Sequence, residues 1–386
     1  PRGLVSVMPQ AWRISICSSS SKAFTAAAIA MLVDEGKLKW DDPVTKYLPG
    51  FELYDPYVTR EITVRDLLSH RSGLERGDLL WYGSEYDRDE ILRRTRFLKP
   101  TWSLRSTFGY QNLMFLAAGQ LIARVSGKSW DEFIRQRIFV PLSMTASNTS
   151  IKHFKNGDDV SSPHGKIEDK IEPIAWRNID NIAPAGSINS SVVDMSQWVR
   201  LQLAQGEYQK QRLLSSGAAK EMQTSQTVIR AEPPFSLFYP EAHFLNYGLG
   251  WFLHDYKGRK VVEHGGAIDG MRAQVAMLPE EKLGLVILTN MDGTILPIAL
   301  MFRIFDAYLG AHHDTDITEE REENADFSEP YFDADQSLLI LVVAYAVRFL
   351  PIAVGPMRAS LAQVGPRLLE AVRLPVEEPG ALGVVG

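Results

Sequence analysis

The chain has 386 residues, of which 45% are hydrophobic and 23% are charged, and its formal net charge is -6 at pH 7. A chain of this length can bury a large core, and its acidic balance argues against nucleic acid as a partner. This composition agrees with a soluble globular enzyme. The single cysteine excludes an internal disulfide and is mild evidence for a cytoplasmic location.

The first predicted element is a buried helix that follows a run of serines. Ala23–Glu35 is almost uncharged until its last two residues, and Gly36 stands in the position of a C′ glycine. A helix that is apolar nearly all round is expected in the core. Ser18–Lys22 would then lie at the N-terminus of this helix, where free backbone N–H groups stabilise developing negative charge.

Within this run, Ser19 is the only serine of the chain that stands three residues before a lysine, Lys22. In a helix this spacing places the hydroxyl and the ammonium on one face, one turn apart. Together they are the parts of an activated serine nucleophile. The alternative is structural, with a serine capping the helix and Lys22 extending to water.

A second polar motif, Tyr110-Gln111-Asn112, stands where a turn at Phe108-Gly109 gives way to an apolar run. A tyrosine beside an ammonium can lose its proton below its solution pKa and then deprotonate a serine. The amide of Asn112 can face the same cavity. The alternative is a tyrosine that packs under a loop.

Helical periodicity dominates the middle of the chain. Gln120–Val125, Trp130–Phe139 and Met195–Leu203 are predicted to be amphipathic helices. Ala231–Phe244 is rich in proline and aromatic residues, which is typical of a loop. Strand alternation appears only from about Val261, so the pattern predicts an α+β fold in which a helical region faces a sheet.

The third motif, His264-Gly265-Gly266-Ala267, precedes two strand-like segments, Gln274–Leu278 and Gly284–Thr289. This order predicts a strand that lines an edge, followed by a hairpin. Glycines there let a substrate approach the backbone, and the amide of Ala267 can join that of Ser19 in an oxyanion hole. Paired glycines are also ordinary in hairpins, which is the structural alternative.

In this order and spacing, the three motifs resemble those of the serine β-lactamase and penicillin-binding-protein superfamily, in its class C β-lactamase-like esterase and peptidase branch. The resemblance covers roughly Ser15–Leu309. It implies a β-lactamase/transpeptidase-like α+β fold, with an antiparallel sheet flanked by helices and a helical subdomain. Relatives have some tens of residues before the nucleophile, so we expect N-terminal strands to be missing here. The stretches that resemble this branch are KAFTAAAIAMLVDEGKLKWDDPVTKYLPGF, ITVRDLLSHRSGL, FGYQNLMFLAAGQLIARVSGKSWDEFIRQRIFVPLSM and IAPAGSINSSVVDMSQWVRLQL.

Carried over by position, the resemblance implies that Ser19 is the acylated nucleophile and Lys22 its proton-shuttling partner. Tyr110 is then the general base and later the general acid, while Asn112 positions the acyl side of the substrate. The substrate-binding strand that the resemblance implies consists of His264, Gly265, Gly266 and Ala267.

The same resemblance bears on the substrate. His264 stands where many relatives have a lysine, so ester or peptide cleavage is favoured over β-lactam hydrolysis. Arg272 is a candidate for the missing positive charge, although a salt-bridged surface arginine is the favoured interpretation.

The function implied is a serine hydrolase that cleaves an ester or amide through an acyl-enzyme, with no cofactor and no metal. Its substrate would be a carboxylester, a D-amino-acid peptide or a β-lactam-like molecule. One alternative is an acyltransferase that uses the same acyl-enzyme, which the motifs do not distinguish from a hydrolase. The other is a non-catalytic binding or filament-forming member of the fold.

Composition divides the chain into a hydrolase domain over 1–310, an acidic linker over 311–336 and a tail over 337–386. Asp314–Asp326 holds seven acidic residues against one arginine, which is typical of a solvated linker. Leu338–Val347 is apolar but shorter than the about 20 residues of a membrane span. We expect it to form a packing helix rather than an interfacial membrane anchor. The oligomeric state is not predicted, and a signal peptide cannot be judged from a first residue that is Pro.

Overall fold

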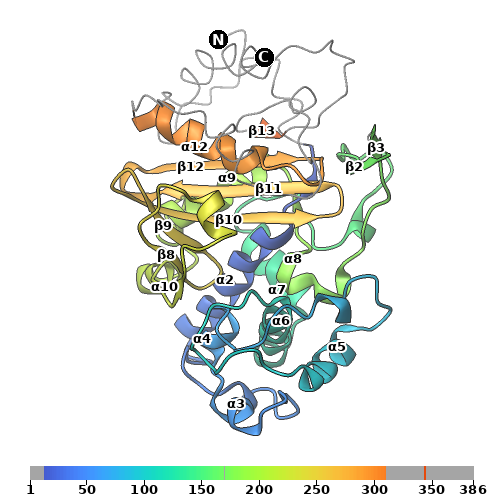
Figure 1. Cartoon of the computed structure of the whole chain (residues 1–386), viewed down its shortest axis with the longest axis vertical. Coiled ribbons are helices and arrows are strands. Elements are labelled where there is room, and N and C mark those ends of the chain that lie inside the picture. Colours follow the sequence, from blue (N-terminus) through green and yellow to red (C-terminus); the bar gives the residue numbers. More distant parts are fainter. Residues whose placement is uncertain (1–12, 169, 310–342, 345–386) are drawn as a thin grey trace.

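The computed structural model describes residues 13–168, 170–309 and 343–344. They form an α+β fold in which a sheet lies between the helix α12 (Leu296–Leu309) and a helical region (Figure 1). The helices α2 (Ser21–Asp34) and α9 (Val192–Leu203) pack on the face of the sheet opposite α12. This is the fold class that the sequence predicts.

The described part of the sheet has the strand order β13-β12-β11-β10-β9-β8-β7. All neighbours are antiparallel except β13, which pairs in parallel with Ile287–Leu288 of β12. The expectation that strands begin near Val261 was wrong, because among the described residues three strands of this sheet, β7, β8 and β9, and the six strands of the small two-stranded sheets precede that residue. These strands are too short to show a clear alternation. The strands of the large sheet are β7 (Thr227–Ile229), β8 (Leu245–Tyr247), β9 (Phe252–Tyr256), β10 (Arg259–Ile268), β11 (Met271–Leu278), β12 (Leu283–Thr289) and β13 (Val343–Ala344).

Alternate residues of each long strand enter two separate cores. In β12, Leu285 and Ile287 pack with α12, whereas Val286 and Leu288 pack with α2 and α9. This follows from the period of two along a strand, which sends successive side chains to opposite faces. The two faces of the sheet therefore have independent surroundings, and Ser19 belongs to the α2 face.

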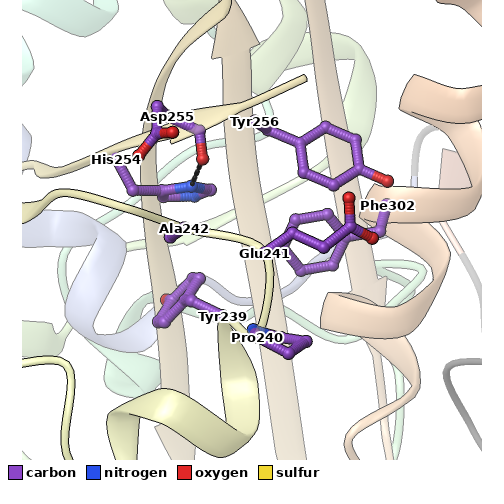
Figure 2. A pocket seen from close by; sticks show the side chains of 8 residues that line it. All are labelled: Tyr239, Pro240, Glu241, Ala242, His254, Asp255, Tyr256 and Phe302. Atoms are coloured by element: carbon purple, nitrogen blue, oxygen red, sulfur yellow. Dashed lines mark hydrogen bonds between the residues drawn. The ribbon is translucent and has the colours of Figure 1, made fainter. Parts of the chain in front are cut away.

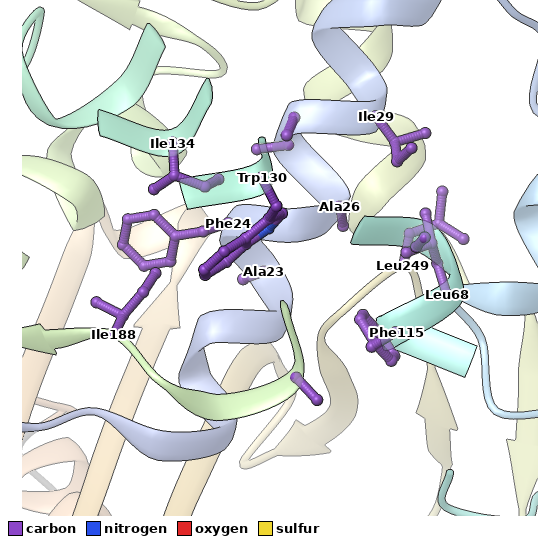
Figure 3. Close-up of a cluster of buried hydrophobic side chains, with 14 of the residues drawn as sticks. Ala23, Phe24, Ala26, Ile29, Leu68, Phe115, Trp130, Ile134, Ile188 and Leu249 are labelled. Carbon is purple, nitrogen blue, oxygen red and sulfur yellow. The ribbon is translucent and has the colours of Figure 1, made fainter. Parts of the chain in front are cut away.

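The helix α2 forms the centre of the larger core (Figure 3). Phe24 stacks on Trp198 of α9 with ring centroids 3.9 Å apart. On another side, the indole N–H of Trp130 donates to the Thr25 hydroxyl at 2.9 Å. The predicted buried helix is thus confirmed, and its end at Gly36, with φ of +68°, adopts the left-handed conformation that glycine allows.

The predicted amphipathic helices also lie where the sequence places them. Gln120–Val125 is part of α6 (Asn112–Ser126), and Trp130–Phe139 is α7 (Trp130–Ile134) followed by a π-helical turn. The remaining described helices are α3 (Pro56–Glu61), α4 (Val64–Leu67), α5 (Arg88–Arg94), α8 (Ala183–Gly186), α10 (Ser216–Met222) and α11 (Phe235–Phe238). The small two-stranded sheets are β1 (Ser15–Ile16) with β4 (Asn189–Ser190), β2 (His164–Ile167) with β3 (Lys170–Pro173), and β5 (Glu207–Tyr208) with β6 (Gln211–Arg212).

The expected linker over 311–336 and most of the tail lie outside the described residues. Val343–Ala344 forms the strand β13, so the helix expected over Leu338–Val347 was wrong at these two residues. Edge strands present unpaired backbone groups that a short extended segment can satisfy. In the part of the chain that the structure describes, no helix is both long and apolar enough to span a membrane. The division into domain, linker and tail stays a prediction.

A buried carboxylate fixes the loop that follows α4. Asp66 is fully buried, completes a capping box with Thr63, and accepts hydrogen bonds from Arg71 at 2.6 Å and Arg105 at 2.7 Å. Burial opposes ionisation of Asp66, but these hydrogen bonds and the two guanidinium charges outweigh it and lower the pKa of the carboxyl. Asp66 therefore stays ionised and holds the two arginines in place.

We predict that Asp66→Asn lowers the free energy of unfolding by about 3 kcal/mol, because two cations lose a buried partner. Asp41→Asn is the matched control, since Asp41 pairs with Arg65 but its side chain is 70% exposed, and it should cost less than about 1 kcal/mol. Urea unfolding measures both.

The pH dependence of this loss has a definite sign. The folded pKa of Asp66 lies below its unfolded value, so its contribution is present above about pH 4 and is lost as the pH falls through the folded pKa. The difference in the free energy of unfolding between the wild type and Asp66→Asn should therefore become smaller in acid. Equal losses in the Asp66 and Asp41 variants would contradict the assignment.

Candidate active site

Ser19 is the one residue between Ile14 and Leu32 that is not buried. It lies in a 3₁₀ turn, Ser18–Ser20, that runs directly into α2. The hydroxyl of Ser20 donates to the carbonyl of His264 at 2.9 Å, and that of Ser18 donates to the carbonyl of Ala267 at 2.7 Å. The neighbours of Ser19 are thus bonded to β10, and Ser19 alone presents its hydroxyl at the surface of this core.

Lys22 is fully buried beneath Ser19. Its Nζ is 3.1 Å from Ser19 Oγ and donates to the carbonyl of Ala185, in α8, at 2.8 Å. Burial, and next the positive charge of Arg76, lower the pKa of Lys22 well below its ordinary value, while Asp78 acts in the opposite direction. A neutral amine is therefore accessible beside the serine hydroxyl, as a general base requires.

Tyr110 lies beside the same pair: Lys22 Nζ is 4.8 Å from the centroid of the tyrosine ring, and the Ser19 side chain is near enough to influence the pKa of the phenol. Burial raises the pKa of Tyr110, although the Ser19 side chain and the charge of Arg76 act to lower it. The expectation that a neighbouring ammonium lowers this pKa is therefore corrected. Burial destabilises the phenolate more than its neighbours stabilise it, so the Tyr110 hydroxyl stays protonated.

Asn112 begins α6 and is buried, with its amide directed to Asp78 rather than to Ser19. Asn112 Nδ2 donates to Asp78 Oδ1 at 2.8 Å. Asp78 also accepts from the indole of Trp81 at 2.8 Å and from Arg76 at 2.7 Å. The guanidinium of Arg76 lies 5.1 Å from the centroid of the Tyr110 ring. Arg76 and Asp78 were not predicted from the sequence, because neither belongs to a recognisable motif.

The strand β10 supplies another side of the site, with the ring centroid of His264 6.4 Å from that of Tyr110. Within the described residues, pairing of β10 with β9 ends at Glu263, and His264–Ile268 pairs with β11 alone. A Cβ at Gly266 would collide with the carbonyl oxygen of Cys17, so glycine is needed for the strand to approach the turn Ser18–Ser20. Ala267 is exposed next to this approach.

The ring of His264 is buried and has partners at both nitrogens. Nδ1 lies 2.6 Å from the carbonyl oxygen of Gly265, and Nε2 lies 3.0 Å from the hydroxyl of Tyr247. These partners assign the tautomer in which Nδ1–H donates and Nε2 accepts. Burial, and next the charge of Lys22, lower the pKa of His264 to about 3. His264 is therefore neutral and does not replace a lysine as a fixed cation.

Arg272 does not supply the fixed positive charge of that lysine either, because its guanidinium pairs with Asp292 at 3.0 Å. This is the salt-bridged arginine that the sequence favours.

A small pocket lies on the other face of the sheet. Its lining comes from the loop Tyr239–Ala242, from β9 and from Phe302 of α12 (Figure 2). Tyr239, Tyr256 and Phe302 belong to the core beneath α12, whereas Ser19 lies on the α2 face. We therefore do not assign this pocket to the candidate site.

We predict that Gly266→Ala destabilises the protein by about 1 to 3 kcal/mol and slows any reaction of Ser19, because the added methyl must displace backbone. Gly265→Ala is the matched control on the adjacent residue, where a Cβ would stand 2.9 Å from the side-chain oxygen of Gln274 rather than close to backbone atoms. Thermal unfolding and the labelling rate of Ser19 measure both effects. A smaller effect at Gly266 than at Gly265 would contradict this account of the strand.

Comparisons with known proteins agree with this geometry. A family model described as Beta-lactamase matches residues 16–301. The chain is 29% identical over 313 residues to the unguisins hydrolase of Aspergillus campestris, an alignment that covers 77% of this chain and 56% of that protein. It thus spans little more than half the length of that curated relative.

Two solved structures are similar over most of the chain. The octameric penicillin-binding protein homologue from Pyrococcus abyssi has a TM-score of 0.70 at 25% identity, covering 81% of this chain and 70% of that one. The D-stereospecific amidohydrolase from Streptomyces sp. has a TM-score of 0.62 at 25% identity, covering 74% of this chain and 85% of that one. The fold predicted from the sequence is confirmed, and hydrolases are among the relatives as predicted.

Proposed function

Because this chain belongs to the β-lactamase family, we propose that it is a serine hydrolase that cleaves amide or ester bonds through an acyl-enzyme on Ser19. The observation that supports this best is the environment of one hydroxyl. Ser19 is the half-buried residue of a buried stretch, Lys22 Nζ donates to its hydroxyl at 3.1 Å, and the ring centroid of Tyr110 lies 4.8 Å from the same Nζ. A nucleophile, a base of lowered pKa and a second proton carrier thus lie close together.

In the proposed acylation, neutral Lys22 takes the proton of Ser19 as Oγ bonds to the substrate carbonyl carbon. The carbonyl π electrons move to oxygen, which the amides of Ser19 and Ala267 receive. Backbone amides that are already oriented toward the developing oxyanion stabilise it without reorganisation during the reaction. Ser18 keeps Ala267 in register with the nucleophile turn through its hydrogen bond to the carbonyl.

Collapse of the tetrahedral intermediate breaks the bond to the leaving amine or alcohol. Tyr110 donates its proton to that leaving group and regains one from the Lys22 ammonium, so that Lys22 is neutral again. The raised pKa of Tyr110 suits this role, since the hydroxyl stays protonated until the leaving group needs its proton. Water then attacks the acyl-enzyme by the same route and releases the acid.

For the substrate, we propose an amide, including one formed by a D-residue, ahead of a β-lactam. The neutral state of His264 supports this order, because a fixed cation for a β-lactam carboxylate is missing at that position. The names of two relatives, an unguisins hydrolase and a D-stereospecific amidohydrolase, point the same way. Transfer of the acyl group to an amine would use the same residues, and product analysis with an added amine distinguishes it.

We predict that an active-site fluorophosphonate adds one label to the wild-type protein and none to Ser19→Ala, as measured by intact mass. Ser106→Ala, which removes an exposed hydroxyl outside the site, is the control and should take up the label like the wild type. Equal labelling of the Ser19→Ala protein would reject Ser19 as the nucleophile.

We also predict that the acylation rate rises with pH. The protonated amine of Lys22 is inactive, and its lowered pKa places the rising limb below the lysine value of about 10.4. Tyr110→Phe should slow acylation by about 10²-fold to 10⁴-fold and keep the rising limb, because Lys22 remains. Stopped-flow measurement with an activated D-amino-acid amide tests both. A rate that is flat with pH, or that rises only near pH 10, would contradict the role of Lys22.

A further inference from the structure

A buried histidine beside Tyr110 takes no part in the chemistry described above. His70 is fully buried, and its ring centroid lies 4.2 Å from that of Tyr110. Its side chain and its backbone bind the two residues that flank this tyrosine. His70 Nδ1 accepts the backbone N–H of Gln111 at 2.9 Å, and the carbonyl of His70 accepts the backbone N–H of Gly109 at 2.8 Å. One residue therefore holds the chain immediately before and after Tyr110.

We propose that His70 is the positioning residue that fixes the Tyr110 hydroxyl beside Ser19 and Lys22. The inference rests on the proposed function, since it assigns how the proton carrier of that reaction is held. A loop tyrosine has two rotatable side-chain bonds and a flexible backbone, and an error of about 1 Å in such a group is enough to slow a reaction about 10²-fold. Clamping the peptide on both sides removes the backbone part of that freedom.

The hydrogen bond to Gln111 requires one particular state of the imidazole. Nδ1 is an acceptor, so the ring proton is on Nε2, and the ring is neutral. Burial, and next the charge of Lys22, lower the pKa of His70 well below its ordinary value and so maintain that state. Nε2 is buried and has no hydrogen-bond partner among the described residues. The ring is thus held by Gln111 and by packing.

The turn that bears His70 is itself fixed from several directions. Arg71, the next residue, donates to buried Asp66 at 2.6 Å and to the carbonyl of Gln226 at 3.0 Å. On the other side, the hydroxyl of Thr227, the first residue of β7, donates to the carbonyl of Ser69 at 2.7 Å. The backbone that bears the imidazole is therefore held in place, so the hydrogen bonds of His70 can restrict the position of Tyr110.

The backbone of His70 makes a matched test available. Its φ is +54°, in the left-handed region that glycine and asparagine tolerate better than alanine does. His70→Gly keeps the backbone unstrained but removes the acceptor, whereas His70→Asn keeps an acceptor oxygen near the position of Nδ1. A comparison of these two variants isolates the hydrogen bond to Gln111 from backbone strain.

The experiment measures fluorophosphonate labelling of Ser19 in the full chain under saturating and subsaturating probe. We expect His70→Gly to lower the maximal labelling rate about 10²-fold with little change in the half-saturating probe concentration, and His70→Asn to recover most of that rate. If His70 had only a structural role, the substitution would change the unfolding temperature but would not lower the maximal labelling rate at an unchanged half-saturating probe concentration. Equal maximal rates in the Gly and Asn variants would overturn the proposal.

A second arm asks whether His70 acts through Tyr110. In a Tyr110→Phe background the hydroxyl to be positioned is gone, so His70→Gly and His70→Asn should label at the same rate. A difference that persists there would show that His70 acts on another group, and it would overturn the proposal.

A third arm does not depend on activity. Hydrogen exchange of the Gln111 amide, followed by mass spectrometry of peptides that span 109–113, should be faster in His70→Gly than in His70→Asn. Unchanged exchange would overturn the clamp even in an active enzyme. A wild-type protein that takes no probe at Ser19 would reject the proposed function instead, and the exchange result would still decide whether His70 holds this segment.

Discussion

The burial of the Lys22 amine is the constraint on which the rest of the site depends. A primary amine loses its hydration when it is buried in a core. This loss destabilises the charged form more than the neutral form, so the pKa of Lys22 falls. The packing of α2, by α6 and α7 on one flank and by α9 on another, offsets the free-energy cost of burying this amine. The apolar character of this helix is thus a condition of the chemistry as well as of the fold.

Three distant parts of the chain meet at Ser19, and each is held by a different kind of contact. The turn Ser18–Ser20 is bonded to β10 through the hydroxyls of Ser18 and Ser20. The strand can come that close because Gly266 has no side chain to meet Cys17. The Tyr110 segment, in contrast, is clamped through its backbone by His70. Short polar contacts and one close backbone approach set the geometry that the apolar core supports.

The buried histidine rings around the Lys22 amine are neutral, which limits the positive charge in this part of the core. His264 and His70 are both kept uncharged by burial and by the neighbouring Lys22. The cation next to Tyr110 is Arg76, which Asp78 pairs at 2.7 Å. The side chain of Arg76 is 59% exposed, so its charge stays in contact with solvent while it lowers the pKa of Lys22.

The sequence by itself determined the elements whose cause is local. An unbroken apolar run predicts α2, and a serine three residues before Lys22 places a hydroxyl above its amine, because helical spacing is the same in any protein. The tertiary structure alone decided the direction of the Tyr110 pKa, since that is a sum over burial and charges from several elements. It also decided that Asn112 binds Asp78, and that His70 clamps the tyrosine, because residues far apart in sequence become neighbours only through packing.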